Sequence, residues 1–286
     1  MVAWLAALPA LAQPVRTEHT EASLVAERSA IVPGDRFMAA LKLDLDEGGW
    51  HVYWKNPGDS GLPPKLSWSA LPEGASAGEF VWPLPHAIPV ASLMNYGYKH
   101  EVVLPFEVSA PASAQPGDTV EMTAKASWLI CLETCIPEDA ELTLRLPVEA
   151  APRADEAAGA AIAAVLQSTA HPASGQAFVQ REEGRFRLSV ADAEIASALR
   201  EAVDVRFFPD SQDVAHAAEQ QVRWGDAGVQ FALAVSDYAD AGDIPLAGLV
   251  VIEDAEGARR GWSLTAQPGS APAGVADRAF SSGGEG

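Results

Sequence analysis

The chain has 286 residues, of which 48% are hydrophobic, and its formal net charge is −20. This length allows two domains of ordinary size, each with its own core. Because only 19 basic residues stand against 39 acidic ones, the chain lacks the basic surface that nucleic-acid binding requires, and it would be repelled by anionic lipid surfaces.

The N-terminus is a short apolar run that ends in Ala10-Leu11-Ala12. Small residues at this spacing are what signal peptidase needs, although the positively charged start of a complete signal peptide is missing. We interpret residues 1–12 as the remnant of an export signal; an ordinary N-terminal strand or helix is the alternative. No other stretch approaches the roughly 20 consecutive apolar residues of a membrane span. We therefore expect an exported chain without a membrane span.

Residues 13–150 have the pattern of an all-β domain. Two alternating runs at 22–28 and 36–46 are separated by the turn signal Pro33-Gly34-Asp35, and further short runs follow with Pro, Gly and Asp between them. Many short strands with a turn roughly every 8 to 12 residues are typical of an immunoglobulin-like β-sandwich.

The composition then changes three times along the chain. Residues 151–172 are alanine-rich and predict a helical linker. Residues 173–267 alternate strand-like runs with one helical pattern and predict a second, smaller β-rich domain. Residues 268–286 are rich in Pro, Gly, Ser and Ala and predict a disordered tail.

The chain has two cysteines, Cys131 and Cys135, and both lie in the run "WLICLETCIP". In an exported protein such a pair is expected to oxidise. A disulfide across three residues restricts the unfolded chain little, because that entropy grows with loop length. A short ring suits a bond that is made and broken, and this favours a redox-active disulfide.

Two other interpretations of the cysteine pair remain open. The pair is either a plain structural disulfide or a metal site, for which Cu(I) is the most plausible ion because thiolates are soft ligands. His51, His86, His100 and Met94 are candidate additional copper ligands, although no spacing in the sequence brings them to the cysteines.

The charges near the pair are negative. Glu133 lies between the cysteines, Glu138 and Asp139 follow, and no Lys, Arg or His is adjacent in the sequence. Negative neighbours disfavour a thiolate, so we expect a raised thiol pKa and a partner that supplies the activated thiolate.

Four motifs occur in one order: "WHVYWKNPGDSG", "WPLP", "NYGY" and the cysteine pair before Ile136-Pro137. Together they resemble the N-terminal periplasmic domain of the DsbD family of thiol–disulfide interchange proteins, and in particular its ScsB (suppressor of copper sensitivity) branch. The resemblance covers residues 20–150 well. Residues beyond 150 are similar to the ScsB periplasmic region in length and position rather than by motif.

The resemblance implies a periplasmic thiol–disulfide oxidoreductase. Cys131 and Cys135 would be the redox pair, reduced by a thioredoxin-like donor domain and oxidised by periplasmic substrate proteins, with no bound cofactor. The family pattern makes Cys135 the residue that forms the mixed disulfide. It also implies a cap loop over the pair, with Met94, Asn95, Tyr96 and Tyr98 at its place here.

Two departures from the DsbD pattern affect these expectations. In the DsbD branch five residues separate the cysteines and a phenylalanine tops the cap, whereas here three residues separate them and Asn95 takes the place of the phenylalanine. In full-length family members a membrane domain follows; this chain is therefore either a fragment of such a protein or a free-standing one with a separate donor. A β-sandwich that binds copper or a partner, with passive cysteines, is the alternative function. The second domain would be a scaffold or docking surface.

Overall fold

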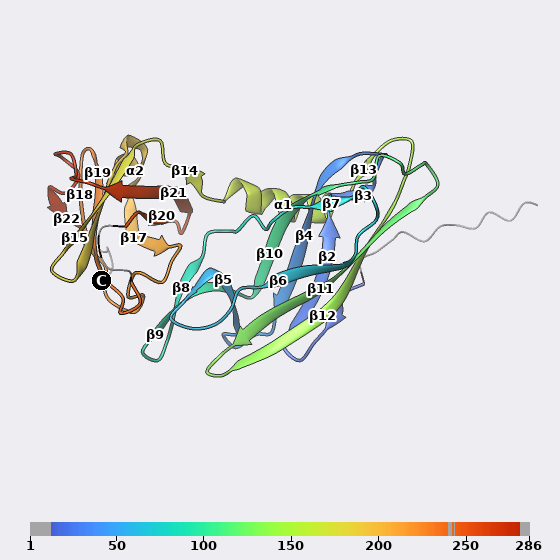
Figure 1. The fold of residues 1–286 in the computed structure, drawn as a ribbon, viewed down its shortest axis with the longest axis horizontal. Helices are drawn as coiled ribbons and strands as arrows, with labels where there is room; N and C mark the ends of the chain where they lie inside the picture. Colours follow the sequence, from blue (N-terminus) through green and yellow to red (C-terminus); the bar gives the residue numbers. More distant parts are fainter. Residues whose placement is uncertain (1–12, 240–241, 243, 281–286) are drawn as a thin grey trace, which may run out of the picture. The chain divides into compact units, whose positions relative to one another are not determined.

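The computed structural model describes residues 13–239, 242 and 244–280 (Figure 1). The predicted export-signal remnant at 1–12 therefore lies outside the described residues, as does the end of the predicted tail, 281–286. By its internal contacts the chain divides into two compact units. Unit 1 is made of Met1–Val52, Pro64–Pro83 and Tyr98–Gln167, and unit 2 of Tyr53–Pro63, Leu84–Gly97 and Ser168–Gly286.

This division differs from the expected boundary at residue 150. Two segments of the predicted first domain, Tyr53–Pro63 and Leu84–Gly97, group with the C-terminal part. The division passes through two strands, β5 (His51–Gly58) and β9 (Leu93–Lys99). Sequence patterns did not indicate this, because each segment looks locally like any other strand of a sandwich.

One sheet of unit 1 has five strands in the order β1-β2-β4-β10-β7. Their bounds are β1 (Val15–Arg16), β2 (Thr20–Ala26), β4 (Arg36–Leu45), β10 (Glu101–Ser109) and β7 (Ser76–Ala77). The predicted turn at 33–35 connects to β4, and Gly34 has the positive φ of 71° that glycine adopts readily.

The other long strands of unit 1 form a hairpin, β11 (Thr119–Cys131) and β12 (Cys135–Pro147), with β6 (Lys65–Ala70) on the outer edge of β11. Buried and exposed residues alternate along both strands of the hairpin. This period of two is what buries one face of a sheet against another. The expected β-sandwich in an all-β chain is confirmed.

The alanine-rich segment forms α1 (Glu156–Gln167), preceded by a short pairing of β3 (Arg28–Ala30) with β13 (Arg153–Ala154). The Asp155 carboxylate accepts a hydrogen bond from the amide of Ala158 at 3.0 Å and so caps the first turn. Ile162 is buried against Ala40 and Val103. The helix is thus part of unit 1.

Replacing Ile162 by alanine is expected to destabilise unit 1 by about 2 kcal/mol, because it removes the one fully buried side chain of α1. Urea unfolding measures the change. The exposed neighbour offers a control: Ala163→Ser is expected to change stability by less than about 0.5 kcal/mol. Equal stability of I162A and the parent chain would show that α1 is an undocked linker.

Unit 2 contains a large mixed sheet whose strands run in the order β17-β20-β21-β15-β16-β19-β18-β22, with β14 beside β21. The bounds are β14 (His171–Pro172), β15 (Gln176–Glu182), β16 (Arg185–Ala191), β17 (Ala202–Pro209), β18 (Gln221–Gly225), β19 (Gly228–Ala234), β20 (Leu246–Asp254), β21 (Arg259–Pro268) and β22 (Arg278–Ala279). The hairpin of β8 (His86–Val90) with β9 also falls largely in this unit. Its helix, α2 (Ala193–Ala198), is capped by Asp192.

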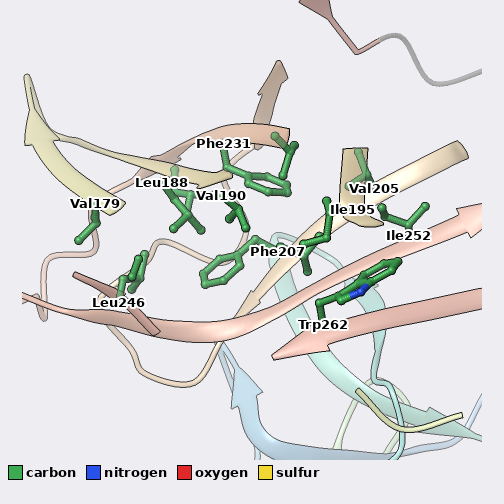
Figure 2. Packing of buried hydrophobic residues seen from close by; sticks show 14 of the residues in the cluster. Val179, Leu188, Val190, Ile195, Val205, Phe207, Phe231, Leu246, Ile252 and Trp262 are labelled. Atoms are coloured by element: carbon green, nitrogen blue, oxygen red, sulfur yellow. The ribbon is translucent and has the colours of Figure 1, made fainter. Parts of the chain in front are cut away.

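The core of unit 2 is continuous and aromatic-rich (Figure 2). Phe207 and Phe231 are fully buried, with ring centroids 6.1 Å apart. Trp262, on β21, belongs to the same cluster. A core of this kind supports the prediction of a second β-rich domain after the helix. Within the predicted tail, Val275 is buried and β22 pairs with β18, so tertiary contacts hold residues whose composition alone predicts disorder.

Candidate redox site

The two cysteines close the hairpin of β11 and β12. Cys131 is the last residue of β11, Cys135 is the first of β12, and they are direct partners in the ladder. Their side chains form a disulfide across a Cα–Cα distance of 4.1 Å. The three residues between them, 132–134, are all exposed. The disulfide therefore lies at the tip of a long, regular hairpin.

The two sulfurs have different surroundings. Cys131 is 2% exposed, whereas Cys135 belongs to the exposed residues. A protein partner that approaches the hairpin tip from solvent therefore meets Cys135 first. The alternation along β11 is broken at this end of the strand, where Ile130 and Cys131 are both buried.

A buried carboxylate anchors the hairpin below the disulfide. Glu138 is 6% exposed and pairs in the ladder with Trp128. Its carboxylate accepts hydrogen bonds from the Thr17 hydroxyl at 2.7 Å, the His19 amide at 2.7 Å and the Trp128 indole at 3.1 Å. Burial alone would raise the pKa of Glu138, but these hydrogen bonds outweigh burial and lower it. The side chain is thus held as a carboxylate.

His51 is the neighbour of Cys131 on the other side of the hairpin. It begins β5 and is the ladder partner of Cys131. Residues directly opposite each other in an antiparallel pair project to the same face of the sheet, with Cβ atoms about 4.5–5.5 Å apart. His51, Cys131 and Cys135 therefore form one row across three strands. No histidine is adjacent to the pair along the chain, but the sheet register makes His51 a neighbour of Cys131 in the fold.

The His51 imidazole is 1% exposed. Burial is the largest effect on its pKa and lowers it, the positive charge of Lys99 lowers it further, and a hydrogen bond to the backbone of Gly49 acts in the opposite direction. The ring is therefore neutral near neutral pH.

The negative charges near the cysteines are less concentrated than the sequence suggests. Asp139 is an exposed partner of Lys125 at 3.2 Å, and the Glu138 carboxylate accepts hydrogen bonds from the Thr17 hydroxyl, the His19 amide and the Trp128 indole. Glu133 lies in the exposed turn, where water screens its charge. The expectation of a raised thiol pKa now depends mainly on the burial of Cys131.

The predicted cap residues lie on strand β9 rather than on a loop. Met94 is partly exposed, whereas Asn95, Tyr96 and Tyr98 are 2%, 0% and 5% exposed. Tyr98 belongs to unit 1, and its hydroxyl donates to the Pro83 carbonyl at 2.9 Å. The other three belong to unit 2, so their position relative to the disulfide stays a prediction.

The "NPGDSG" and "NYGY" motifs are hydrogen-bonded to each other within unit 2. The Asp59 carboxylate accepts a hydrogen bond from the Met94 amide at 2.8 Å, and the Ser60 hydroxyl donates to Asn95 at 2.9 Å. Gly58 has a φ of 84°, and a Cβ there would lie 2.3 Å from the Met94 carbonyl oxygen. The glycine is required because the turn backbone touches β9 directly.

Asn56 connects the same turn to the C-terminal part of unit 2. Its amide group donates to the Pro209 carbonyl at 2.7 Å and to the Ser211 carbonyl at 3.1 Å. Its side-chain oxygen accepts from Gln212 at 2.7 Å. This buried network explains why the motif segment groups with unit 2, which sequence reading missed.

The network continues from Gln212 to His216 and Tyr96. The Gln212 NH₂ group donates to Asn56, so the Gln212 side-chain oxygen is the atom that faces His216, and it accepts a hydrogen bond from His216 Nε2 at 3.1 Å. Since Nε2 carries the proton of the neutral ring, His216 Nδ1 accepts a hydrogen bond from the Tyr96 hydroxyl at 3.3 Å. Burial lowers the pKa of His216, which agrees with this neutral tautomer.

Replacing Tyr96 by phenylalanine removes the donor to His216 and is expected to destabilise unit 2 by about 1 kcal/mol at neutral pH. Chemical denaturation measures the change. Tyr238, which is 86% exposed, supplies the matched control, and Tyr238→Phe is expected to leave the unfolding midpoint unaltered. A Y96F chain as stable as the parent would mean that the Tyr96 hydroxyl bond contributes nothing.

The candidate copper ligands are distributed over both units. His51 and His100 belong to unit 1, His86 and Met94 to unit 2. His100 is exposed, with Nδ1 3.8 Å from a Glu47 carboxylate oxygen, and His86 Nε2 lies 3.1 Å from Arg259 Nη1. Among the described residues, no group of three or more His, Cys, Asp or Glu side chains is arranged to hold a metal ion.

The hairpin lies in a part of the chain that matches a known protein family. Residues 21–147 match the family model described as thiol:disulfide interchange protein DsbD, N-terminal. This part of the chain is similar to the N-terminal domain of DsbD proteins. The predicted resemblance is thereby confirmed. Both cysteines, His51 and the cap positions lie inside the matched DsbD region.

Solved structures agree on the fold. The chain is similar to the N-terminal periplasmic domain of ScsB from Proteus mirabilis, with a TM-score of 0.59, 19% identity and coverage of 88% of this chain and 95% of that one. This similarity extends beyond the DsbD N-terminal region into the second unit. A protein of unknown function from Porphyromonas gingivalis W83 matches with a TM-score of 0.26, 9% identity and coverage of 86% and 99%, a similarity too low to inform the fold.

Among curated proteins, none matches the chain. Within the described residues, no helix combines the length and the hydrophobicity that crossing a membrane requires.

Proposed function

We propose that this chain relays reducing equivalents through Cys131 and Cys135. A thioredoxin-like donor would reduce the disulfide, and the resulting dithiol would reduce disulfides of periplasmic substrate proteins. The observation that carries the proposal is the disulfide at the hairpin tip of a domain similar to the DsbD N-terminal domain, with one sulfur buried and the other exposed.

The asymmetry of the two sulfurs supports different roles. Exchange begins when a thiolate attacks a disulfide sulfur in line, so the attacked or attacking sulfur must be reachable. Cys135 is the exposed member, and this supports the prediction that it forms the mixed disulfide with donor and substrate. Cys131 would then be the resolving residue, held by β11 next to Cys135.

Export to the periplasm belongs to this proposal. Related DsbD domains act in thiol–disulfide interchange, and the similar ScsB structure is described as a periplasmic domain. In an oxidising compartment a reduced pair persists only if a donor keeps restoring it. Unit 2 contains no cysteine, so we assign it a scaffolding or docking role.

The test is the redox equilibrium of the pair against glutathione, read by thiol alkylation and mass spectrometry in metal-free buffer. A reversible couple in the range of exchange proteins is expected. A pair that stays oxidised below about −300 mV would identify a structural disulfide and refute the relay.

Copper binding through Cys131 and Cys135 is the alternative function and stays a prediction. Titration of the reduced chain with Cu(I) against a competing chelator distinguishes the two functions. Tight binding of one ion per chain, lost in a Cys131→Ser chain, combined with failure to exchange with glutathione, would favour the copper alternative.

A further inference from the structure

The row of His51, Cys131 and Cys135 places an imidazole beside the buried sulfur of the pair. Cys131 is a ladder partner of both other residues, on β5 and on β12. His51 and Cys131 are 1% and 2% exposed. A side chain that takes the proton of Cys131 efficiently must therefore itself lie inside the protein.

Such a group is needed in one step of the relay. After Cys135 has formed a mixed disulfide, Cys131 must attack as a thiolate to release the partner. A buried thiol in apolar surroundings holds its proton more tightly than an exposed one, because burial disfavours the charged form. Without a base close by, this resolving step would be slow near neutral pH.

The acidic residues around the hairpin tip are poor candidates for this base. The Glu138 carboxylate already accepts three hydrogen bonds, from the Thr17 hydroxyl, the His19 amide and the Trp128 indole. Asp139 is exposed and paired with Lys125, and Glu133 lies in the exposed turn.

His51 has the right chemistry. Its ring is kept neutral by burial, with the positive charge of Lys99 on β9 acting in the same direction. A neutral imidazole carries one N–H and one nitrogen lone pair that accepts a proton. The ring hydrogen bond to the backbone of Gly49 fixes the orientation of the imidazole.

We propose that His51 is the general base for Cys131 in the resolving step, an inference that rests on the proposed exchange function. The imidazole takes the proton of the Cys131 thiol, and the thiolate attacks Cys135 Sγ. The Cys131–Cys135 bond forms, and the bond from Cys135 to the partner sulfur breaks. The partner leaves as a thiolate and receives the proton from the imidazolium directly or through water, so the partner disulfide is reduced as the dithiol is oxidised. In the opposite direction His51 returns the proton to Cys131.

Single-turnover kinetics with the reduced full-length chain test this proposal. One equivalent of the aromatic disulfide dithiobis(nitrobenzoate) releases one coloured thiolate when it reacts with Cys135 and a second when Cys131 resolves the mixed disulfide. In His51→Gln the second release is expected to slow about 100-fold near neutral pH, while the first changes little. In the parent chain, the rate of the second release should be nearly independent of pH once His51 is neutral. The variant rate should rise about tenfold per pH unit as the thiolate forms from solvent, until the two converge.

The controls separate this role from a structural one. His171→Gln, an exposed substitution in unit 2, is expected to leave both releases unchanged. In His51→Ala, added imidazole is expected to restore the second release, and this rescue also serves as the test if His51→Gln does not fold. Equal second-phase rates and pH profiles in parent and variant would overturn the proposal, and so would a loss without rescue. If the parent chain itself gives no second release, the exchange function fails regardless of His51.

Discussion

Replacing Cys135 by serine is expected to abolish disulfide exchange, while replacing Cys131 by serine is expected to leave a chain that becomes trapped on its partner. The difference follows from exposure: Cys135 lies at the surface of the hairpin tip, and Cys131 is buried behind it. Without Cys135 no sulfur is available to form the mixed disulfide. Without Cys131 the mixed disulfide forms but cannot be resolved.

The measurement uses two disulfide probes, oxidised glutathione and an oxidised thioredoxin-like protein, and the adducts are identified by mass. The C131S chain is expected to accumulate a one-to-one adduct at Cys135, and the C135S chain to accumulate less by at least about 100-fold, because reactivity follows access to the thiolate. The double serine variant provides the background. Equal adducts on both single variants would contradict the assignment of roles, and exchange by C135S at the parent rate would refute the proposed site.

Local sequence patterns were sufficient for the fold class. The alternation along β11 and β12 and the turn at Gly34 are properties of short segments, and each was readable without tertiary information. The alanine-rich run predicted α1 for the same reason, since helix propensity is local. The cysteine pair was identified because its spacing alone makes it a poor structural staple.

Other features depend on which strands become neighbours. His51 reaches Cys131 only through the register of β5 against β11, and a single-residue slip would have turned its side chain to the other face. The contact of Gly58 with Met94 likewise depends on the approach of two segments far apart in the sequence. The sequence identified "NPGDSG" and "NYGY" as motifs of a family, but their hydrogen bonds to each other explain why those residues are needed.

The second large effect is expected at Glu138. Replacing it by glutamine preserves the size of the side chain but removes the charge and turns an amide N–H₂ group toward the donors from Thr17 and Trp128. Hydrogen bonds to a buried charged group are stronger than neutral ones, and a donor left without an acceptor adds its desolvation cost. We expect unit 1 to lose about 3 kcal/mol at neutral pH. Glu141→Gln, an exposed substitution on the same strand, is the matched control and should be nearly neutral.

The pH dependence makes this prediction specific. The folded-state pKa of Glu138 is lowered from its ordinary value of 4.5, so the unfolded chain takes up the proton first on acidification. The stabilisation is therefore complete above the unfolded value and is lost as the pH falls through the folded one. Urea unfolding of the parent and E138Q chains should show a gap that is constant at neutral pH and shrinks below about pH 4.5. A gap that does not change with pH would mean that the carboxylate charge contributes nothing. Because Glu138 and Trp128 form a ladder pair three positions from the disulfide on the same hairpin, loss of this anchor is also expected to broaden the range of hairpin conformations and slow resolution by Cys131.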